Sequence, residues 1–390
     1  MTPISATSRE KKPVTKNGSA FESVALLLQG GGALGAYQAG VYEALHDAGI
    51  IPDWIGGISM GAINGAIIAG NKPAERIAKL RGFWNSLTTS QYQSVLNMFT
   101  PFVRQGGEMA HNAWNQTSTY SAMVEGVSGF FTPRFPPAWL SPPGSPGATS
   151  FYDTGALKET LEEFIDFDIL NEDVLRYTTS AVNIRSGNSA TFDSLEQKIA
   201  PEHIMASGAL PPGFPAVEID GQYYWDGGLI SNTPLEWVME GSKQNTLVFQ
   251  VDLWSARGAF PKDIPSVLTR QKEIQYSSRT RAMTDHFRHT QRLRHAYARL
   301  HEQMPEELKN TPEAKMLKDV SGPHVYNIVH LIYRPADYEG YSKDCEFSQL
   351  SMKEHWKAGY DATVHSLGHK EVLELPVCGE GIEIYDLTRG

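Results

Sequence analysis

Short apolar runs that end at turns mark the first part of the chain. Residues 23–29 form one such run and residues 246–252 form another. Runs of this length that are apolar throughout are typical of strands buried on both faces of a parallel sheet. After the first run, residues 36–48 place apolar side chains at helical spacing and stop at Gly49, which suits a helix C-terminus.

A second strand–turn–helix unit follows directly. Residues 50–55 lead through the pentapeptide Gly-Ile-Ser-Met-Gly at 57–61 into residues 62–69, which are mostly small and apolar and predict a buried helix. Another helix is predicted to begin at Pro73, because proline suits the first helical turn. Strands that alternate with helices predict a three-layer α/β domain with a mainly parallel central sheet.

The later pattern adds further strands and then becomes helical. Residues 178–184 and 189–192, separated by a polar turn, predict a β-hairpin, and residues 202–208 predict a short helix. Residues 222–225 predict a strand that ends at Asp226.

Beyond Pro261 the periodicity predicts a long helix over residues 267–304, then a strand over 325–333 and a helix over 351–367. The predicted organisation is a flexible tail over residues 1–20, an α/β domain over 21–260 and a helix-rich C-terminal extension over 261–390.

Two stretches leave alternatives open. Residues 88–150 are rich in proline, glycine and aromatic residues, and a loop region of this length is usually functional or mobile. It is either a cap whose apolar side chains meet lipid or an insertion packed on the domain surface. On the long helix, Arg281, Arg288, Arg292 and Arg299 lie near one face. They form either a basic surface for anionic headgroups or an ordinary solvated face paired with the chain's own carboxylates, and the pattern favours the second.

The composition excludes several classes of protein. The chain has 390 residues, is 41% hydrophobic and 20% charged, and is therefore globular. A formal charge of −10 argues against nucleic-acid binding. Cys345 and Cys378 fit neither a disulfide framework nor a metal site, which favours a reducing, cytoplasmic location. No apolar run reaches the roughly 18 residues of a membrane span, and the polar residues 1–18 are not a secretory signal.

The pentapeptide at 57–61 carries the first candidate for chemistry. A serine at a sharp strand-to-helix turn, here Ser59, is held in a strained backbone that exposes its hydroxyl. Gly57 and Gly61 let the strand and the helix approach each other closely. A serine hydroxyl becomes a nucleophile only beside a base and beside donors for the developing oxyanion, so the chain must supply both.

The glycines at 30–32 are candidates for the oxyanion donors. At a strand-to-helix turn, the backbone N–H groups of Gly31 and Gly32 can point at a developing negative charge, and the helix dipole adds to the effect. On this basis a substitution at Gly32 is expected to lower turnover while leaving folding largely intact. The stretch to Gly35 also fits a dinucleotide fingerprint, with Asp53 about twenty residues on. That alternative is disfavoured because Asp53 precedes the next strand instead of ending it.

The base is predicted to be an aspartate. The twelve histidines lack a loop signature that would place one beside Ser59. Asp226 follows a strand and precedes Gly227 and Gly228, so we expect it at the carboxyl edge of the sheet, where Ser59 also lies. A common Asp-Gly turn would have the same sequence.

These motifs, in this order, resemble those of the patatin-like phospholipases. Residues 206–217, with Gly221, Tyr224, Asn232 and Pro234, are similar to the family's segment around its catalytic aspartate. The resemblance covers roughly residues 23–252. It implies a Ser-Asp dyad, with Ser59 as nucleophile, Asp226 as base and Gly30, Gly31 and Gly32 as the oxyanion hole. It further implies hydrolysis of lipid acyl esters through an acyl-enzyme, with no metal and no cofactor.

One departure concerns the substrate. Many members of the family carry Arg or Lys just before the last glycine of the first motif, whereas this chain has Leu34. The headgroup preference therefore stays open. The alternatives are an esterase or thioesterase that acts on soluble acyl compounds, or a catalytically silent scaffold at a membrane surface. The expected partner is an acyl-ester substrate, with peripheral contact at the inner face of a membrane as an open alternative. The segment after Pro261 resembles an extension of some bacterial members, and the sequence does not specify the oligomeric state.

Overall fold

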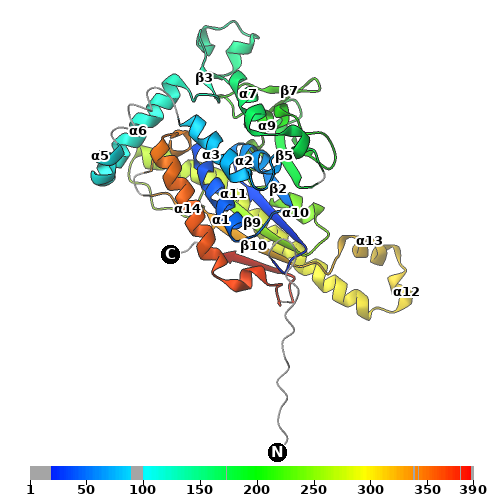
Figure 1. Ribbon diagram of the computed structural model, residues 1–390. Coiled ribbons are helices and arrows are strands. Elements are labelled where there is room, and N and C mark those ends of the chain that lie inside the picture. The colour runs from blue at the N-terminus through cyan, green and yellow to red at the C-terminus, as the bar shows by residue number, and fades with distance from the viewer. Residues whose placement is uncertain are drawn as a thin grey trace, which may run out of the picture.

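A computed structural model describes residues 19–88, 100–172, 174–336, 339–340, 342–377 and 379–387. Within these residues, one central sheet has the strand order β11-β10-β9-β1-β2-β5-β8-β7, and β6 pairs with β5. Helices α1, α2 and α14 cover one face of this sheet and helices α10 and α11 cover the other (Figure 1). The predicted three-layer α/β fold with a helix-rich C-terminal region is confirmed.

The middle of the sheet is parallel and buried. Strand β1 (Ser23–Leu28) lies between β2 (Trp54–Gly57) and β9 (Thr246–Asp252), and β2 pairs in parallel with β5 (Arg176–Asn183). Every residue of β1 and β9 is buried, as their uninterrupted apolar runs predict. Leu28 pairs with both Gly57 and Val251, so the carboxyl ends of these strands meet at one edge.

Two strands pair with β5 in the antiparallel direction. Strands β5 and β6 (Ser189–Asp193) form the predicted hairpin. Strand β8 (Gln222–Asp226) is also antiparallel to β5, and its last residue pairs with Ala181; β7 (Val217–Ile219) completes this side. Strand β8 therefore begins at the carboxyl edge of the parallel strands and runs inward. Its last residue, Asp226, still lies near that edge.

The C-terminal region is built into the same sheet. Strands β10 (Tyr326–Ile332) and β11 (Ile382–Asp386) extend it in parallel beyond β9. The long helix α11 (Ile264–Gln303) spans 40 residues, and it carries the predicted helical periodicity. Its last turns project from the body together with α12 (Glu306–Lys309) and α13 (Pro312–Val320) (Figure 1).

Two glycines bring the backbones of α1 (Ala36–Asp47) and α14 (Gln349–Leu367) into contact. A Cβ atom on Gly40 of α1 would overlap the carbonyl oxygen of Trp356. A Cβ atom on Gly359 of α14 would likewise overlap the carbonyl oxygen of Tyr37. The first helix of the chain is thus packed directly against the last long one.

The remaining helices follow the predicted order with small shifts. Helix α2 (Met60–Ala69) is entirely buried, and α3 (Arg76–Leu87) begins three residues after Pro73. The start is delayed because Glu75 N–H donates to Lys72 O at 2.8 Å and closes a separate turn first. The other helices in the described residues are α5 (Thr100–Gln105), α6 (Gly107–Glu125), α7 (Gly155–Phe164), α8 (Phe167–Leu170), α9 (Pro201–Ser207) and α10 (Leu235–Gly241).

The aromatic segment at 88–150 divides into a buried and an exposed part. Residues 89–99 lie outside the described ranges. Phe130 and Phe131 join the main core, whereas Phe135, Trp139 and Leu140 are 96%, 75% and 69% exposed. The exposed part lies in the loop between β3 (Thr132–Pro133) and β4 (Tyr152–Asp153), which projects from the body (Figure 1).

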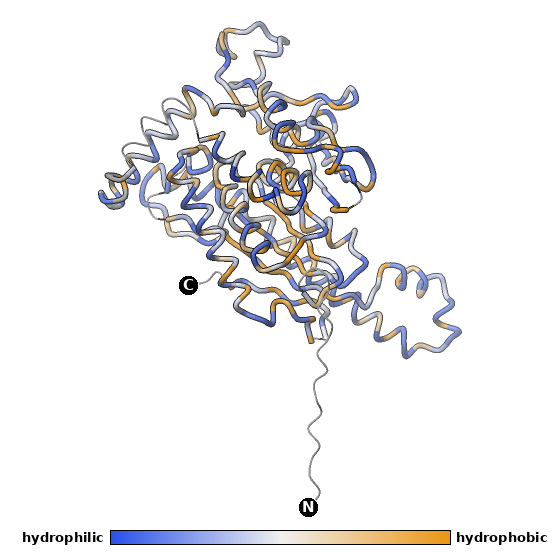
Figure 2. The backbone as a smooth tube through the Cα atoms, viewed as in Figure 1, coloured by the Kyte–Doolittle hydropathy of each residue, from blue (hydrophilic) through white to orange (hydrophobic). Residues whose placement is uncertain are grey.

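Hydrophobic residues follow the inner strands and hydrophilic residues follow the outer turns (Figure 2). In the part of the chain that the structure describes, we find no helix with the length and apolar character that a bilayer crossing requires.

Candidate active site

Ser59 lies at the sharp turn between β2 and α2. Its backbone has φ 55° and ψ −121°, a left-handed conformation that a serine adopts only under strain. Its N–H donates to the Ser207 hydroxyl at 3.0 Å. A Cβ atom on Gly57 would overlap the Gly61 carbonyl, and one on Gly61 would overlap Leu28 O. The two motif glycines therefore give the turn the space that the sequence predicts for them.

Asp226 ends β8 beside Ser59. Its side chain is 3% exposed, and its Oδ1 accepts the Gly228 N–H at 2.7 Å. Burial raises the pKa of Asp226 from 3.8 to about 7, although the hydrogen bonds from the Gly228 N–H and the Ser59 hydroxyl both lower it. Gly227 has no room for a side chain, because its Cβ would lie 2.6 Å from Ser180 O. Asp226 is thus a buried carboxyl group whose pKa lies well above its ordinary value, in the same cavity wall as Ser59.

The three glycines of the first motif differ in the hydrogen bonds and contacts of their backbone groups. Gly30 N–H donates to Asn232 Oδ1 at 3.1 Å, and Gly30 O accepts from Asn232 Nδ2 and from Trp254 Nε1. Both the N–H and the C=O of Gly30 are therefore already hydrogen-bonded within the protein. Gly31 and Gly32 follow in the same turn, and a Cβ atom on Gly30 would lie 3.0 Å from Ser59 Cβ, so the turn lies directly against Ser59.

Gly32 is needed for both its conformation and its space. Its φ of 55° is left-handed, and a Cβ atom there would overlap the carbonyl oxygen of Asp344. The expectation that a substitution at Gly32 leaves folding intact is therefore wrong. Further along, Gly35 O accepts the Asn64 amide at 2.9 Å where α1 begins.

Ser59 and Asp226 open into a cavity of about 470 Å³. The glycines at 30–32 and Gly228 form part of its wall. Most of the other lining side chains are apolar and several are aromatic: Met60, Ile63, Met123, Phe130, Phe131, Phe151, Tyr152, Leu210, Phe214, Trp254, Tyr276 and Phe347. All five residues predicted as nucleophile, base and oxyanion donors thus line one largely apolar cavity.

The cavity wall also contains residues from two parts of the chain that lie outside the sequence motifs. Ala122, Met123 and the Phe130–Phe131 pair belong to the 88–150 segment, and Cys345 and Phe347 belong to the C-terminal region. Trp254 was missed by the sequence reasoning, although it lies two residues beyond a strand whose carboxyl end is at this edge. That position is where ligand-binding residues of parallel sheets gather, and it is the signal that would have found Trp254.

The structure does not support the two alternatives that depend on other residues, which are a dinucleotide site with Asp53 and a histidine as the base. Asp53 accepts hydrogen bonds from Ser23 Oγ at 2.6 Å and from Val24 N–H at 3.1 Å, at the opposite edge of the sheet from the glycine turn. It is therefore not placed to bind a ribose there. No histidine is among the described residues that line the cavity. His330 lies 3.1 Å from Asp252, and His355 lies 3.4 Å from Glu339.

Most arginines on this face of α11 are paired with other groups of the same chain. Arg288 Nε and Arg292 Nε lie 3.6 and 3.2 Å from the Glu380 carboxylate. Arg299 donates to Gly379 O at 2.6 Å. At these three positions the contacts favour the interpretation of a solvated face paired with the chain's own groups.

Comparison with known proteins identifies the family. The family model described as "Patatin-like phospholipase" matches residues 26–239, and one described as "Patatin phospholipase" matches residues 274–377. "Patatin-like phospholipase domain-containing protein 6" of Mus musculus is 38% identical over 79 residues, which are 20% of this chain and 6% of that protein. "Neuropathy target esterase sws" of Drosophila melanogaster is 29% identical over 101 residues, 25% of this chain and 7% of that protein.

The chain thus aligns with only a small part of each of these relatives. Among solved structures, VipD from Legionella pneumophila aligns over 94% of this chain and 72% of its own, with a TM-score of 0.42 and 14% identity. The first family model covers more than half of the 390 residues and includes the elements that carry Ser59 and Asp226. The chain belongs to the patatin-like phospholipase family.

Proposed function

We propose that the protein hydrolyses acyl esters of lipids, with Ser59 as the nucleophile and Asp226 as the base. The observation that carries this proposal is that Ser59 and the buried Asp226 carboxylate meet in the wall of one cavity of about 470 Å³ whose lining is largely apolar. The family of the chain supports the same class of reaction.

The chemistry follows from these two side chains. Ionised Asp226 accepts the proton of the Ser59 hydroxyl as Oγ attacks the ester carbonyl carbon. The tetrahedral intermediate collapses, Asp226 returns the proton to the leaving alcohol, and the acyl group stays on Ser59. Water then attacks the acyl-enzyme carbonyl while Asp226 takes its proton. The second tetrahedral intermediate collapses, Asp226 returns the proton to Ser59 Oγ, and the carboxylic acid leaves.

The oxyanion donors in this proposal are the N–H groups of Gly31 and Gly32. Gly30 was expected to contribute as well, but its N–H is held by Asn232, so we assign it to shaping the turn. Helix α1 begins at Ala36, directly after this turn, so its positive end lies close to it. A donor of this kind typically contributes about 3 kcal/mol to the stability of the transition state.

The lining of the cavity favours a long acyl chain over a small polar one. Aromatic side chains gather there, with Phe131 and Phe214 ring centroids 5.2 Å apart and Phe130 5.7 Å from Phe214. None of the described residues that line it is lysine or arginine, so the wall offers no cation to a phosphate group. An ester whose acyl chain fills the cavity and whose headgroup stays outside fits these walls. A soluble acyl ester or thioester is the second candidate.

A membrane surface is the proposed source of such a chain. Met123 and Phe151 line the cavity and are also 44% and 48% exposed. Trp139 and Phe135 are exposed in the neighbouring loop between β3 and β4. Flotation with phosphatidylcholine vesicles tests this contact. We expect binding that the pair Phe135→Ser and Trp139→Ser weakens, whereas equal flotation of the double variant would contradict it.

The dyad is tested by substituting each member. We expect Ser59→Ala and Asp226→Asn to abolish hydrolysis of p-nitrophenyl esters, and Ser59→Ala to abolish labelling by a fluorophosphonate. Ser189→Ala and Asp168→Asn change exposed residues and serve as matched controls. Wild-type rates in either dyad variant would reject the mechanism. A folded wild type that the fluorophosphonate does not label would favour the scaffold, and a profile that falls with acyl length would favour the soluble esterase.

A further inference from the structure

A short turn from the C-terminal region covers the outer side of the glycine turn. This turn is η5 (Lys343–Cys345), and it packs against η1 (Gly32–Gly35). The Asp344 carbonyl oxygen occupies the space that a side chain on Gly32 would need. Asp344 and Cys345 also line the cavity. The glycine turn is therefore held between Ser59 on its inner side and η5 on its outer side.

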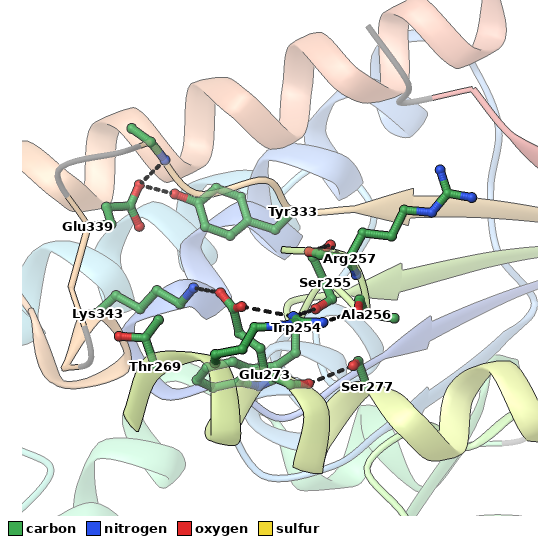
Figure 3. Close-up of polar contacts among 12 residues, drawn as sticks. Trp254, Ser255, Ala256, Arg257, Thr269, Glu273, Ser277, Tyr333, Glu339 and Lys343 are labelled. Carbon is green, nitrogen blue, oxygen red and sulfur yellow. Dashed lines mark hydrogen bonds and ion pairs between the residues drawn. The ribbon is translucent and has the colours of Figure 1, made fainter. Parts of the chain in front are cut away.

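Two ion pairs tie η5 to α11. Lys343 Nζ lies 2.8 Å from Glu273 Oε1, and Lys272 Nζ lies 2.5 Å from Asp344 Oδ2. The Lys343 and Glu273 side chains are only 2% and 9% exposed. Arg270 Nη1 holds the second Glu273 oxygen at 3.2 Å. Figure 3 shows Lys343 reaching across to Glu273 on α11, with Trp254 beside the pair.

Trp254 links these charges to the glycine turn. The Nζ atoms of Lys272 and Lys343 each lie 5.5 Å from the centroid of its ring, within the range of a cation–π contact. The indole N–H of Trp254 donates to Gly30 O at 2.9 Å. The ion pairs therefore support the glycine turn at two residues. They hold η5 against Gly32, and their lysines contact Trp254, which is hydrogen-bonded to Gly30.

We propose that the pairs Lys343–Glu273 and Lys272–Asp344 form a clamp that positions the glycine turn for catalysis. The four side chains are positioning residues, because they act through η5 and Trp254. This inference rests on the proposed function, in which the N–H groups of Gly31 and Gly32 receive the oxyanion. Such donors must be held to a fraction of an ångström, because a displacement of about 1 Å can cost 100-fold in rate.

A purely structural role makes a different prediction. Replacing a buried ion pair by apolar groups often leaves stability unchanged, whereas removing one partner destabilises the fold. If the clamp served only stability, a variant would unfold more easily while its folded fraction kept the wild-type kcat. If the clamp positions the turn, kcat falls in the folded protein and KM stays close to its wild-type value.

The test compares Lys343→Met, Glu273→Gln and the double variant. The concentration of active protein is measured by fluorophosphonate titration, so kcat refers to folded sites alone. We expect kcat to fall roughly 10- to 100-fold in each single variant. The double variant should lose no more than the worse single variant, because the pair acts as a unit. Lys309→Met is the matched control, since it breaks an exposed pair with Glu306 at 2.9 Å on the projecting α12.

Hydrogen exchange of the amides at 30–35 gives a readout that needs no activity. Gly30 N–H and Leu34 N–H are hydrogen-bonded in the turn, and we expect both to exchange faster in the variants. Unchanged exchange, or faster exchange with wild-type kcat, would overturn the clamp. An inactive wild type would reject the proposed function. The hydrogen-exchange rates alone would then decide whether the two ion pairs hold the glycine turn. Should Lys343→Met not fold, Glu273→Gln carries the test, because glutamine keeps the size and an acceptor oxygen.

Discussion

Asn232 and Gly30 exchange two hydrogen bonds although 202 residues separate them in the chain. Asn232 Oδ1 accepts the Gly30 N–H at 3.1 Å, and Asn232 Nδ2 donates to Gly30 O at 3.0 Å. Asn232 follows β8 by six residues, so the loop that begins at Asp226 also holds the glycine turn. The loop after Asp226 and the glycine turn are thus joined through this one amide.

Asn232→Ala removes both of these hydrogen bonds. The Gly30 N–H is then buried without a partner, which typically costs about 1–3 kcal/mol, and the turn relaxes away from Ser59. We expect kcat for p-nitrophenyl esters to fall roughly 10-fold or more, with little change in KM. Asn188→Ala, in the exposed turn between β5 and β6, is the control. A wild-type kcat in Asn232→Ala would show that the turn does not depend on this contact.

Gly31→Ala and Gly32→Ala should differ in stability. The three atoms nearest to a methyl group on Gly31 all belong to the Leu253 side chain, whose end lies 2.6 Å away and can shift, and the φ of 178° is not left-handed. A methyl group on Gly32 meets the Asp344 backbone at a left-handed φ, which alone costs about 1–2 kcal/mol. We expect urea unfolding to show a clearly larger loss for Gly32→Ala. Equal losses would mean that η5 moves freely away from the turn.

Activity should depend on the ionisation of Asp226. Its pKa is raised to about 7 by burial, and only the ionised carboxylate can accept the Ser59 proton. We expect kcat/KM to rise with pH from about pH 5, to reach half of its maximum near pH 7 and to level off above that value. A pH series with a p-nitrophenyl ester, corrected for its own hydrolysis, measures this. A profile that is flat from about pH 5 upward would contradict Asp226 as the base.

The same carboxyl group should make stability depend on pH. The folded state keeps the Asp226 proton up to a pKa of about 7, whereas the unfolded chain loses it near 3.8. The unfolded state therefore binds fewer protons between these values, and this group lowers the free energy of unfolding as pH rises through that window. Each pKa unit corresponds to about 1.4 kcal/mol.

Asp226→Asn cannot ionise and should escape this loss. We expect the variant to be more stable than the wild type by a few kcal/mol at about pH 8, with the difference shrinking towards about pH 5. Urea unfolding at the two pH values measures it, and Asp168→Asn, at an exposed aspartate, is the control. A difference that stays constant between the two pH values would mean that Asp226 does not titrate in this window.

The local backbone geometry of the site was predictable because it depends on neighbours in the sequence. The turn at Ser59 follows from two glycines within two residues of it, and the burial of β1 and β9 follows from their own apolar runs. The approach of Asp226 to Ser59 was predicted from strand ends alone. The direction of β8 was not, since it depends on pairing with β5.

What the sequence did not indicate lies in contacts between distant segments. Lys343 and Glu273 are 70 residues apart, and neither belongs to a motif, so no pattern pointed to their pairing. The C-terminal region was predicted as mainly helical with one strand over residues 325–333, which the structure shows as β10, whereas β11 was not predicted. These strands join the central sheet through pairing between distant segments, β10 with β9 and β11 with β10.

The contact between α1 and α14 through Gly40 and Gly359 has a consequence for how this gene can be rearranged. A chain cut before α11 would leave one side of β9 open and a bare groove along α1, shaped to receive another helix. We therefore expect such a fragment to aggregate. An exchange of the segment after residue 260 that keeps the fold should therefore keep glycine at both positions 40 and 359.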